Sequence, residues 1–376
     1  MNIVVDDKYH RQKLITWWDQ DKLTNSNVLV VGAGALGNEI VKNLALVGVG
    51  KIHIVDMDKI ENSNLSRGVF FRNSDLGSFK AEVVTSRVME LNPDISVTFD
   101  TVEIQKLGVG FINNFDLIIG GLDNREARLW INRAARKLGK YWVDGAIEGI
   151  RGLVRMFGVD GPCYECTLGE KDWQILNHRK SCALLRPDDI LSGKVPTNAT
   201  TASVIGALQV QEAIKFLVGS QESLSLEGRS LNFVGENMSF FINSYEEDPD
   251  CLSHDLYQDI YPWNTNLDSK TLKEIGNAYF PNIKNLQFDF EDDFVVSGKC
   301  INCTSSFDFS FFSHFASPGV GHCTKCDEPL ALNSMTSCGD TDELANRKIK
   351  EMNFAFEDIL TIRNGMARVH QIIKRG

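Results

Sequence analysis

The sequence lacks the features that would place it in a membrane or in an oxidising compartment. Nowhere do 18 apolar residues follow one another, so no segment is long enough for a transmembrane helix. The first residues, MNIVVDDKYHRQ, contain no basic stretch followed by an apolar run, which is the pattern of an export signal. We therefore expect a soluble, cytoplasmic protein.

Basic residues are also fewer than acidic ones. The chain has 39 Lys and Arg against 50 Asp and Glu, which gives a net charge of −11. Such a balance disfavours nucleic acid and anionic membranes as partners, because both repel a negative surface. Internal repeats and low-complexity tracts are absent as well. A globular chain of 376 residues remains, long enough for one large domain and a smaller appendage.

The first two thirds of the chain alternate apolar runs with amphipathic stretches. The amphipathic stretches that begin near Leu36 and Lys80 predict helices, and an apolar stretch at 203–218 predicts another. Alternation of this kind predicts an α/β fold with a doubly wound, mostly parallel sheet and helices on both faces. The runs typical of strands lie at 28–31, 51–56, 95–100, 116–121, 140–145 and 151–157.

Changes in composition divide the chain into regions. Residues 1–24 are polar and aromatic and predict an N-terminal helical extension, and residues 25–255 predict the α/β domain. A polar stretch at about 167–200 inside this domain is an unusually long loop, which is uncommon without a function. Residues 256–376 predict a smaller α+β region, in which the segment from Glu343 begins as a helix and continues as two strands.

A glycine-rich turn follows the first predicted strand. Gly32, Gly34 and Gly37 would let the backbone turn tightly and would let a helix N-terminus approach phosphates. Asp56, 19 residues after Gly37, stands where a carboxylate can accept hydrogen bonds from ribose hydroxyls. Taken alone, this pattern is equally typical of an NAD-dependent dehydrogenase.

Charged residues after Asp56 favour ATP chemistry over hydride transfer. Cations beside a nucleotide stabilise the charge that builds on pyrophosphate when ATP is cleaved between its α and β phosphates. Asp123 ends a predicted strand, where a carboxylate can hold magnesium. Each residue taken singly could instead be a solvated surface charge or a helix cap. The other residues of the set are Asp58, Asn64, Arg67, Arg72 and Lys80.

Seven sequence blocks carry a resemblance to a known family. Residues 9–255, about two thirds of the chain, resemble the adenylation domain of the ubiquitin-activating (MoeB/ThiF/HesA-like) superfamily. Within it they are most similar to the catalytic subunits that activate ubiquitin-like modifiers. The blocks are YHRQ (9–12), GAGALG, DMDKIENSNLSR, DLGSFKAE, GLDNREARLWIN, DGAIEGIRG and PCYECTL.

The resemblance implies a Rossmann-like adenylation domain that uses ATP and Mg²⁺ to adenylate a ubiquitin-like protein ending in glycine. In the family pattern, Asp56 binds ribose and Asp123 coordinates magnesium. Phosphates are held by the residues at Asn64, Arg67 and Lys80.

The resemblance also implies an assembly. Arg11 of the YHRQ block would reach the ATP of a partner subunit. Because the chain carries both this arginine and a complete set of nucleotide residues, we expect a homodimer with two working sites. Gly68 departs from the family, which usually has Gln at this place.

Six of the nine cysteines stand in CxxC pairs, which in a chain without an export signal indicates metal binding rather than disulfides. Two zinc ions per chain are expected. His254 could instead be a surface histidine, and the first CxxC could pair with one of the later pairs. The zinc ribbon, at about 297–330, would be formed by Cys300, Cys303, Cys323 and Cys326. The Cys3His site would be formed by Cys163, Cys166, Cys251 and His254.

Cys182 is the candidate nucleophile. It lies in NHRKSCALLRP, and basic neighbours favour the thiolate over the thiol. In the enzymes that this chain resembles, the thioester-forming cysteine follows the CxxC at a short distance. We expect Cys182 to carry the modifier as a thioester before transfer to a conjugating enzyme. The alternative is that Cys182 is a buried, unreactive cysteine. Cys338 has no such surroundings, and no role is assigned to it.

Two other functions compete with this hypothesis. A sulfur-carrier adenylyltransferase of the MoeB/ThiF type would stop at the adenylate or pass it to a sulfur donor, without an enzyme thioester. A zinc-stapled scaffold that only senses nucleotide is disfavoured by the full set of phosphate-binding residues. The C-terminal region, 256–376, is expected to recruit the conjugating enzyme.

Overall fold

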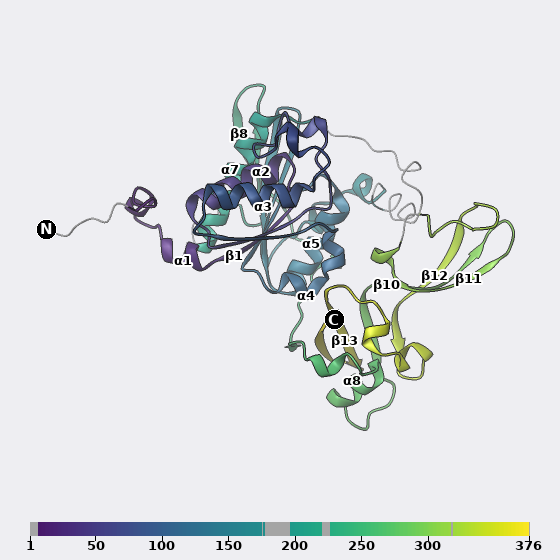
Figure 1. Ribbon diagram of the computed structural model, residues 1–376. Helices are drawn as coiled ribbons and strands as arrows, with labels where there is room; N and C mark the ends of the chain where they lie inside the picture. The colour runs from purple at the N-terminus through teal and green to yellow at the C-terminus, as the bar shows by residue number, and fades with distance from the viewer. Residues whose placement is uncertain (1–6, 175, 177–195, 220–225, 317–318, 376) are drawn as a thin grey trace. The chain divides into compact units, whose positions relative to one another are not determined.

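The computed structural model describes residues 7–174, 176, 196–219, 226–316 and 319–375. They form two compact units (Figure 1). The described residues of the first unit lie within 7–104, 112–168 and 196–256. Those of the second unit lie within 105–111, 169–176 and 257–375.

The first unit is built on an eight-stranded sheet in the order β3-β2-β1-β4-β5-β6-β7-β8. The strands from β3 to β5 run parallel, and those from β5 to β8 are antiparallel. This mixed sheet with a parallel core confirms the predicted α/β, Rossmann-like class. The strands are β1 (Asn27–Val31), β2 (Lys51–Val55), β3 (Ser96–Asp100), β4 (Leu117–Gly120), β5 (Tyr141–Glu148), β6 (Arg151–Phe157), β7 (Arg229–Val234) and β8 (Ser239–Ser244).

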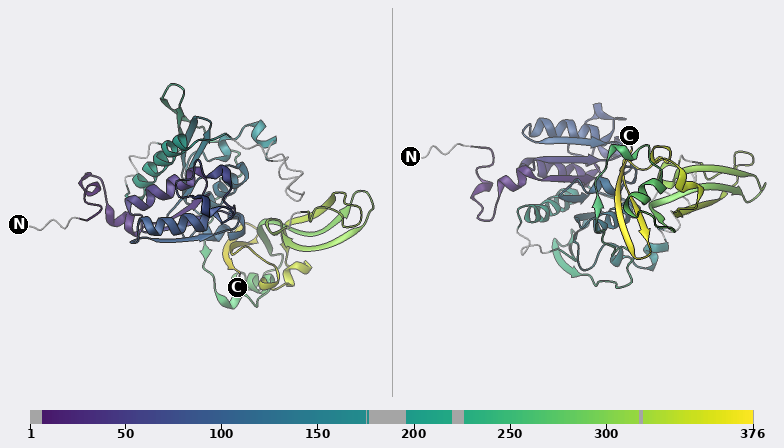
Figure 2. Two further views of the ribbon diagram at one scale, coloured as in Figure 1. Left: turned by 45° about the horizontal axis from the view of Figure 1, so that its top comes forward. Right: turned by 90° about the horizontal axis from the view of Figure 1, so that it is seen from below.

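Helices cover the parallel part of the sheet. Helix α2 packs against both α3 and α7, so these three form one layer, which Figure 2 shows in two further views. Because the strand order reverses between β1 and β4, right-handed crossovers place α5 on the opposite face. None of the described helices is both long and apolar enough to cross a bilayer. The helices of the first unit are α1 (Gln20–Asn25), α2 (Ala35–Val47), α3 (Lys80–Leu91), α5 (Arg125–Lys137) and α7 (Ala199–Leu217), and the short α4 (Val109–Ile112) lies mostly in the segment 105–111 of the second unit.

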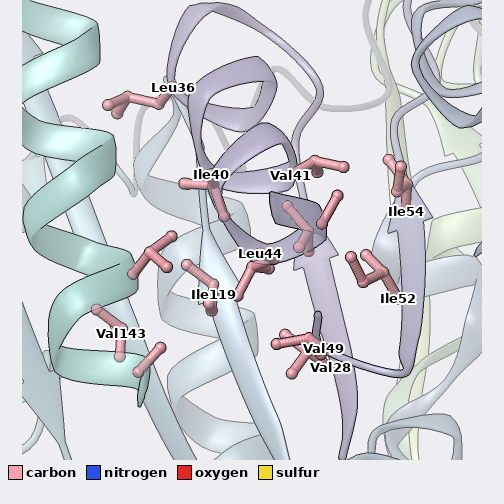
Figure 3. Close-up of a cluster of buried hydrophobic side chains, with 14 of the residues drawn as sticks. Val28, Leu36, Ile40, Val41, Leu44, Val49, Ile52, Ile54, Ile119 and Val143 are labelled. Carbon is pink, nitrogen blue, oxygen red and sulfur yellow. The ribbon is translucent and has the colours of Figure 1, made fainter. Parts of the chain in front are cut away.

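The core of the first unit lies between the sheet and α2 (Figure 3). Ile40 and Leu44 of α2 are one helical turn apart and fully buried, facing Val28, Ile52 and Ile119 of the strands. Each such side chain contributes about 1.5–3 kcal/mol when it leaves water. The strands β1 and β4 consist mostly of Val, Ile and Leu because helices cover both of their faces, whereas β2 also contains Lys51 and His53.

The N-terminal segment is less helical than predicted. Its described part holds one turn of 3₁₀ helix at Gln12–Leu14 and the short helix α1. Tyr9 packs against Gly48, where a Cβ would lie 2.5 Å from the tyrosine ring. The hydroxyl of Tyr9 also accepts a hydrogen bond from the amide of Asn92 at 2.8 Å. The segment is therefore fastened to the first unit by side-chain contacts rather than by a continuous helix.

The second unit contains a six-stranded sheet in the order β11-β10-β13-β14-β9, with β12 paired to β10. Its core is rich in aromatic side chains, among which Phe288, Phe294 and Phe312 are fully buried. The mixture of a sheet and a short helix agrees with the predicted α+β class. The elements are α8 (Leu272–Tyr279), β9 (Ile260–Tyr261), β10 (Gln287–Cys300), β11 (Ser306–Phe312), β12 (Leu330–Gly339), β13 (Glu357–Asn364) and β14 (Ala367–Lys374).

One expected helix in this unit is not present. The segment that begins at Glu343 forms two short 3₁₀ turns, Glu343–Asn346 and Ile349–Glu351, separated by extended residues. Lys348 forms a β-bridge with Thr271, and this extended pairing interrupts the helix. The helical spacing of the buried side chains misled the prediction, because the same residues reach the core from two separate turns.

Candidate functional site

The carboxyl ends of β1 and β4 meet where the strand order of the first unit reverses. Ligands of open α/β sheets bind at this kind of reversal. Gly32 directly follows β1, and Asp123 comes shortly after β4. The predicted nucleotide residues on these two connections therefore lie at one edge of the sheet.

The three glycines of the turn have different structural roles. Gly32 has a φ of +97°, and a Cβ there would lie 2.5 Å from the carbonyl oxygen of Gly121. A Cβ on Gly37 would lie 1.9 Å from the carbonyl oxygen of Gly32. A Cβ on Gly34, the N-cap of α2, would meet no protein atom within 4 Å. Two glycines thus serve packing, and Gly34 leaves open space at the N-terminus of the helix.

Asp56 follows β2 and is tied to the glycine turn. Its carboxylate accepts hydrogen bonds from the backbone N–H of Ala33 at 2.6 Å and of Asp58 at 2.8 Å. Burial raises the pKa of Asp56, while the charge of Lys80 and these two N–H groups act in the opposite direction. The arrangement holds a carboxylate beside the turn, in the position expected for a ribose ligand.

Asp58 and Lys80, both predicted to lie at the nucleotide, contact each other. The ammonium nitrogen of Lys80 lies 2.7 Å from an Asp58 oxygen, and its backbone N–H donates to the Asp58 carbonyl at 2.9 Å. Lys80 is 9% exposed and opens α3. Asp58 therefore fixes the direction of the lysine side chain and offsets its charge.

Asn64 and Arg67 lie on the connection between β2 and α3. The Asn64 side chain accepts a hydrogen bond from the Glu61 N–H at 2.8 Å and so shapes a 3₁₀ turn. Gly68 follows, and a Cβ there would lie 2.2 Å from the buried ring of Phe71. The departure from the family pattern at Gly68 thus has a local cause, because Phe71 fills the space of a side chain.

Asp123 is exposed and stands between β4 and the first turn of α5. The next residue, Asn124, caps α5 by accepting a hydrogen bond from the Ala127 N–H at 2.8 Å. The cap ends the turn at Asp123 and leaves its carboxylate at the surface, where an incoming cation can reach it.

Two buried amide side chains that the sequence interpretation missed shape the turn. Asn38 donates to the carbonyls of Ala33 and Gly34 at 2.8 and 3.0 Å, and accepts from the Phe70 N–H at 3.0 Å. Gln209 of α7 donates to the Gly120 carbonyl at 2.8 Å. Each could have been noticed in the sequence as a polar residue at a position where the helical spacing predicts a buried apolar one.

Arg11 lies directly before the first 3₁₀ turn and is exposed. Apolar side chains beside it are exposed too: Leu14 at 71%, Ile15 at 41% and Trp17 at 43%. Clustered exposed apolar side chains are typical of a protein contact.

The structure gathers the first set of predicted metal ligands. The Cys163 sulfur lies 3.7 Å from that of Cys166 and 3.6 Å from that of Cys251. The Nε2 atom of His254 lies 3.3 Å from the Cys166 sulfur, and the ligand atoms of all four residues lie within 4.8 Å of one another. On the other side of the ring, Nδ1 of His254 lies 3.3 Å from a carboxylate oxygen of Glu247. We call this set the first cluster.

The donors of the first cluster fit a zinc ion. Zn–S bonds of about 2.3 Å at tetrahedral angles place two sulfurs about 3.8 Å apart, close to the observed separations. Burial raises the pKa of the Cys163 and Cys251 thiols, so their ionisation needs a compensating cation. Burial and then the charge of Arg136 lower the pKa of His254, which favours the neutral imidazole that metals bind.

The second cluster is formed by Cys300, Cys303, Cys323 and Cys326. The sulfurs of Cys300 and Cys326 are 3.4 Å apart, and those of Cys303 and Cys323 are 3.5 Å apart. The Cys303 N–H points at the Cys300 sulfur and the Lys325 N–H at the Cys323 sulfur, each at 3.4 Å. Such N–H donors stabilise thiolates. Each CxxC of the ribbon therefore has the local form of a metal-binding turn.

The other two cysteines do not enter these clusters. Cys182 falls outside the described residues and stays a prediction. Cys338 is buried in the second unit, where burial raises the pKa of its thiol to about 12. A thiol with this pKa is a poor nucleophile at neutral pH.

The model of the ThiF family matches residues 9–253. The chain belongs to the ThiF family. The matched residues cover the glycine turn, the connection after β2, the turn at Asp123 and the first CxxC, but not the second cluster.

Curated relatives of this ThiF-family chain include three kinds of enzyme. It is 35% identical over 239 residues to "SAMP-activating enzyme E1" of Haloferax volcanii, which covers 62% of this chain and 81% of the relative. It is 32% identical over 261 residues to "Sulfur carrier protein adenylyltransferase" of Thermus thermophilus, covering 65% and 89%. It is 40% identical over 156 residues to "NEDD8-activating enzyme E1 catalytic subunit" of Arabidopsis thaliana, covering 38% and 34%.

Among solved structures, Escherichia coli MccB with ATP has a similar fold. The TM-score is 0.56 at 24% identity, over 67% of this chain and 75% of MccB. At this identity the likeness concerns the fold, which agrees with the mixed sheet described above.

Proposed function

We propose that this ThiF-family protein is an ATP-dependent adenylyltransferase that activates the C-terminal glycine of a ubiquitin-like protein. The observation that carries the proposal is the arrangement at the strand reversal. The glycine turn, the half-buried Asp56 with the Asp58–Lys80 pair, and Asp123 come from three different connections and lie at one edge of the sheet. A dehydrogenase would have no use for the lysine and the second carboxylate.

Each residue at this edge would have a distinct task. The turn and the N-terminus of α2 would bind phosphates through backbone N–H groups, and Asp56 would accept from ribose hydroxyls. Arg67, Lys80 and Asn64 would hold the phosphates, the two cations stabilising the charge on the departing pyrophosphate. Asp123 would hold Mg²⁺, which supplies Lewis-acid stabilisation of that charge when bound.

A protein substrate is supported by the outer strand of the sheet. Strand β8 pairs only with β7 among the described strands, and three consecutive side chains on it are about half exposed. Because side chains alternate along a strand, the first and third of these share one face of the sheet, and neighbouring exposed apolar side chains are typical of protein contact surfaces. By their names, the relatives described above activate SAMP, adenylylate a sulfur carrier protein or activate NEDD8. The three side chains are Phe240, Phe241 and Ile242.

After adenylation, we propose, Cys182 attacks the adenylate carbonyl, AMP leaves, and the modifier is held as a thioester. Residues 256–376 would then recruit the conjugating enzyme that accepts it. The second candidate is a sulfur-carrier adenylyltransferase without this thioester, which the similarity to the Thermus thermophilus enzyme favours. Both candidates share the adenylation step and differ in the fate of the adenylate.

We further propose a homodimer in which Arg11 of each chain completes the site of the other. The exposed apolar side chains beside Arg11 support a contact with a second copy. Mixing Arg11→Ala protein with Asp123→Ala protein would then assemble one intact site per mixed dimer and restore part of the activity. A mixture no more active than its components would contradict the trans arrangement.

The decisive experiment for the activity is ATP–pyrophosphate exchange in the presence of candidate ubiquitin-like proteins that end in glycine. Wild type should exchange, and Asp123→Ala should lose exchange by several orders of magnitude while keeping its melting temperature, because this carboxylate is exposed. Exchange at the wild-type rate in Asp123→Ala would remove Asp123 from the site.

The fate of the adenylate is tested separately with Cys182→Ala. This variant should keep exchange and lose the adduct with the modifier that a reductant cleaves, and Cys338→Ala serves as the matched cysteine control. An adduct that persists in Cys182→Ala would contradict the thioester at Cys182. If wild type forms no adduct with a partner that supports exchange, the sulfur-carrier candidate takes its place.

A further inference from the structure

A stripe of polar side chains runs along the buried side of α5. Arg128, Asn132 and Arg136 are four residues apart and share one face of the helix. Their exposed fractions are 8%, 1% and 7%. A helix normally turns apolar side chains toward the core at this spacing, so polar side chains here must be held by specific partners.

At the N-terminal end of the stripe, Arg128 holds the turn that contains Asp123. It donates to the Asp144 carboxylate at 2.9 Å and to the Gly145 carbonyl at 3.0 Å. It also donates to the carbonyl of Leu122, the residue directly before Asp123. The position of α5 therefore sets the position of this turn.

In the middle of the stripe, Asn132 reaches the first cluster. Its carbonyl oxygen accepts the N–H of Tyr164 at 2.8 Å, and its amide nitrogen lies 3.3 Å from the sulfur of Cys163. Because the Tyr164 N–H can only donate, the orientation of the amide is determined, and its NH₂ group must face the sulfur.

Neighbouring residues strengthen the connection between α5 and the cluster. Arg133 donates to both oxygens of Glu165, between Cys163 and Cys166, at 3.0 and 2.7 Å. Glu165 also accepts a hydrogen bond from Ser253, which lies between the other two members of the cluster. Helix α5 is thus bonded directly to the Cys163–Cys166 half of the first cluster, through Glu165 to the half that contains Ser253, and near its N-terminus to the Asp123 turn.

We propose that Asn132 is a positioning residue that links metal binding at the first cluster to the placement of Asp123. A metal-bound Cys163 is a thiolate, and a thiolate accepts a stronger hydrogen bond from the Asn132 amide than a thiol does. Metal binding therefore draws α5 toward the cluster and orders the turn at its N-terminus. The link to catalysis rests on the proposed function of Asp123, whereas the link to the metal does not.

The test is Asn132→Asp in the zinc-loaded protein. The carboxylate keeps the size of the side chain and the acceptor for Tyr164, but it replaces the donor to Cys163 with a negative oxygen. The affinity for zinc, measured by transfer to a chromophoric chelator, should fall about 10- to 100-fold. At saturating zinc, hydrogen exchange of the amides at 122–128 should accelerate, and the Mg²⁺ concentration for half-maximal ATP–pyrophosphate exchange should rise.

Asn232→Asp is the matched control, because Asn232 is a half-buried asparagine of β7 whose side chain bonds only to Ser230 among the contacts described. It should change none of the three readings. Unchanged zinc affinity in Asn132→Asp would overturn the proposal. Weaker zinc binding with unchanged exchange at 122–128 would reduce Asn132 to a support for the metal and would overturn the link to Asp123.

Two further measurements separate failure of the Asn132 proposal from misfolding of the variant and from failure of the proposed function. Should Asn132→Asp fail to fold, removal of zinc from the wild-type protein must still speed hydrogen exchange at 122–128, and slow exchange there would overturn the proposal. Should wild type show no ATP–pyrophosphate exchange at all, the proposed function fails, while zinc transfer and hydrogen exchange still decide the role of Asn132.

Discussion

Alanine at Gly37 should lower the stability of the folded protein, whereas alanine at Gly34 should weaken nucleotide binding. Both glycines belong to the same turn, and a sequence motif treats them alike. In the structure, a Cβ on Gly37 would lie 1.9 Å from a backbone oxygen, whereas a Cβ on Gly34 would meet no protein atom within 4 Å. Gly37→Ala should therefore damage the folded protein itself, and Gly34→Ala should be felt only when a nucleotide arrives.

The size of each effect follows from these contacts. The carbonyl oxygen of Gly32 is backbone and cannot rotate away from a Cβ on Gly37, so the cost should reach the upper end of overpacking, about 3 kcal/mol. For a unit of this size, that lowers the melting temperature by about 6–12 °C. Alanine at Gly34 is a weaker helix cap than glycine but restricts the unfolded chain, and these terms roughly cancel within about 1 kcal/mol.

The assay compares thermal unfolding without nucleotide to Mg·ATP binding by calorimetry. Gly34→Ala should melt within about 4 °C of wild type and bind ATP at least about tenfold more weakly, because its methyl group occupies the space that phosphates would enter. Gly37→Ala should melt early even without ATP. A Gly34→Ala protein that melts as early as Gly37→Ala, or that binds ATP like wild type, would refute this division of roles.

Two further measurements test other parts of the molecule. Metal analysis should find two zinc ions per chain, and Cys300→Ser should lose one of them, so a single zinc in wild type would contradict the two-cluster assignment. In the second unit, burial and then the charge of Glu291 raise the pKa of the fully buried Asp358 to about 7. The unfolded carboxyl ionises near pH 4, so the free energy of unfolding should fall by up to about 4 kcal/mol as the pH rises from about 4 to about 7. In thermal unfolding, Asp358→Asn should show a smaller fall than wild type. Parallel pH profiles of wild type and Asp358→Asn would contradict this prediction.

Much of the first unit could be predicted because its signals are local. Strands β1 and β4 are short runs made mostly of Val, Ile and Leu, each followed by a turn and an amphipathic helix, and that alternation favours a parallel sheet. The helix expected from Glu343 failed for the opposite reason. Its residues are placed by a bridge to Thr271, a contact distant in sequence that no periodicity records.

The candidate site divides in the same way. Gly32 and Asp56 are predictable from their spacing after a strand, and the two cysteine clusters are predictable from their CxxC pairs. Asn132 could not be found like this, since its amide contacts Cys163, which lies 31 residues away in sequence. A buried asparagine on a helix indicates that it has a hydrogen-bond partner, but only the tertiary structure shows which residue that partner is.

The segment 105–111 has a consequence for how the chain is made. It is encoded between β3 and β4, yet it pairs with the second unit: the Phe356 N–H donates to the Lys106 carbonyl, and the Val109 N–H points at the Asp358 carboxylate across 249 residues of sequence. At 5–20 residues per second, a ribosome needs about 10–50 s to supply these partners. During that interval, the segment's backbone groups must be solvated by water or shielded by a chaperone. Truncation near residue 256 would make the condition permanent, because Phe356 and Asp358, the partners of this segment within the second unit, would then never be made.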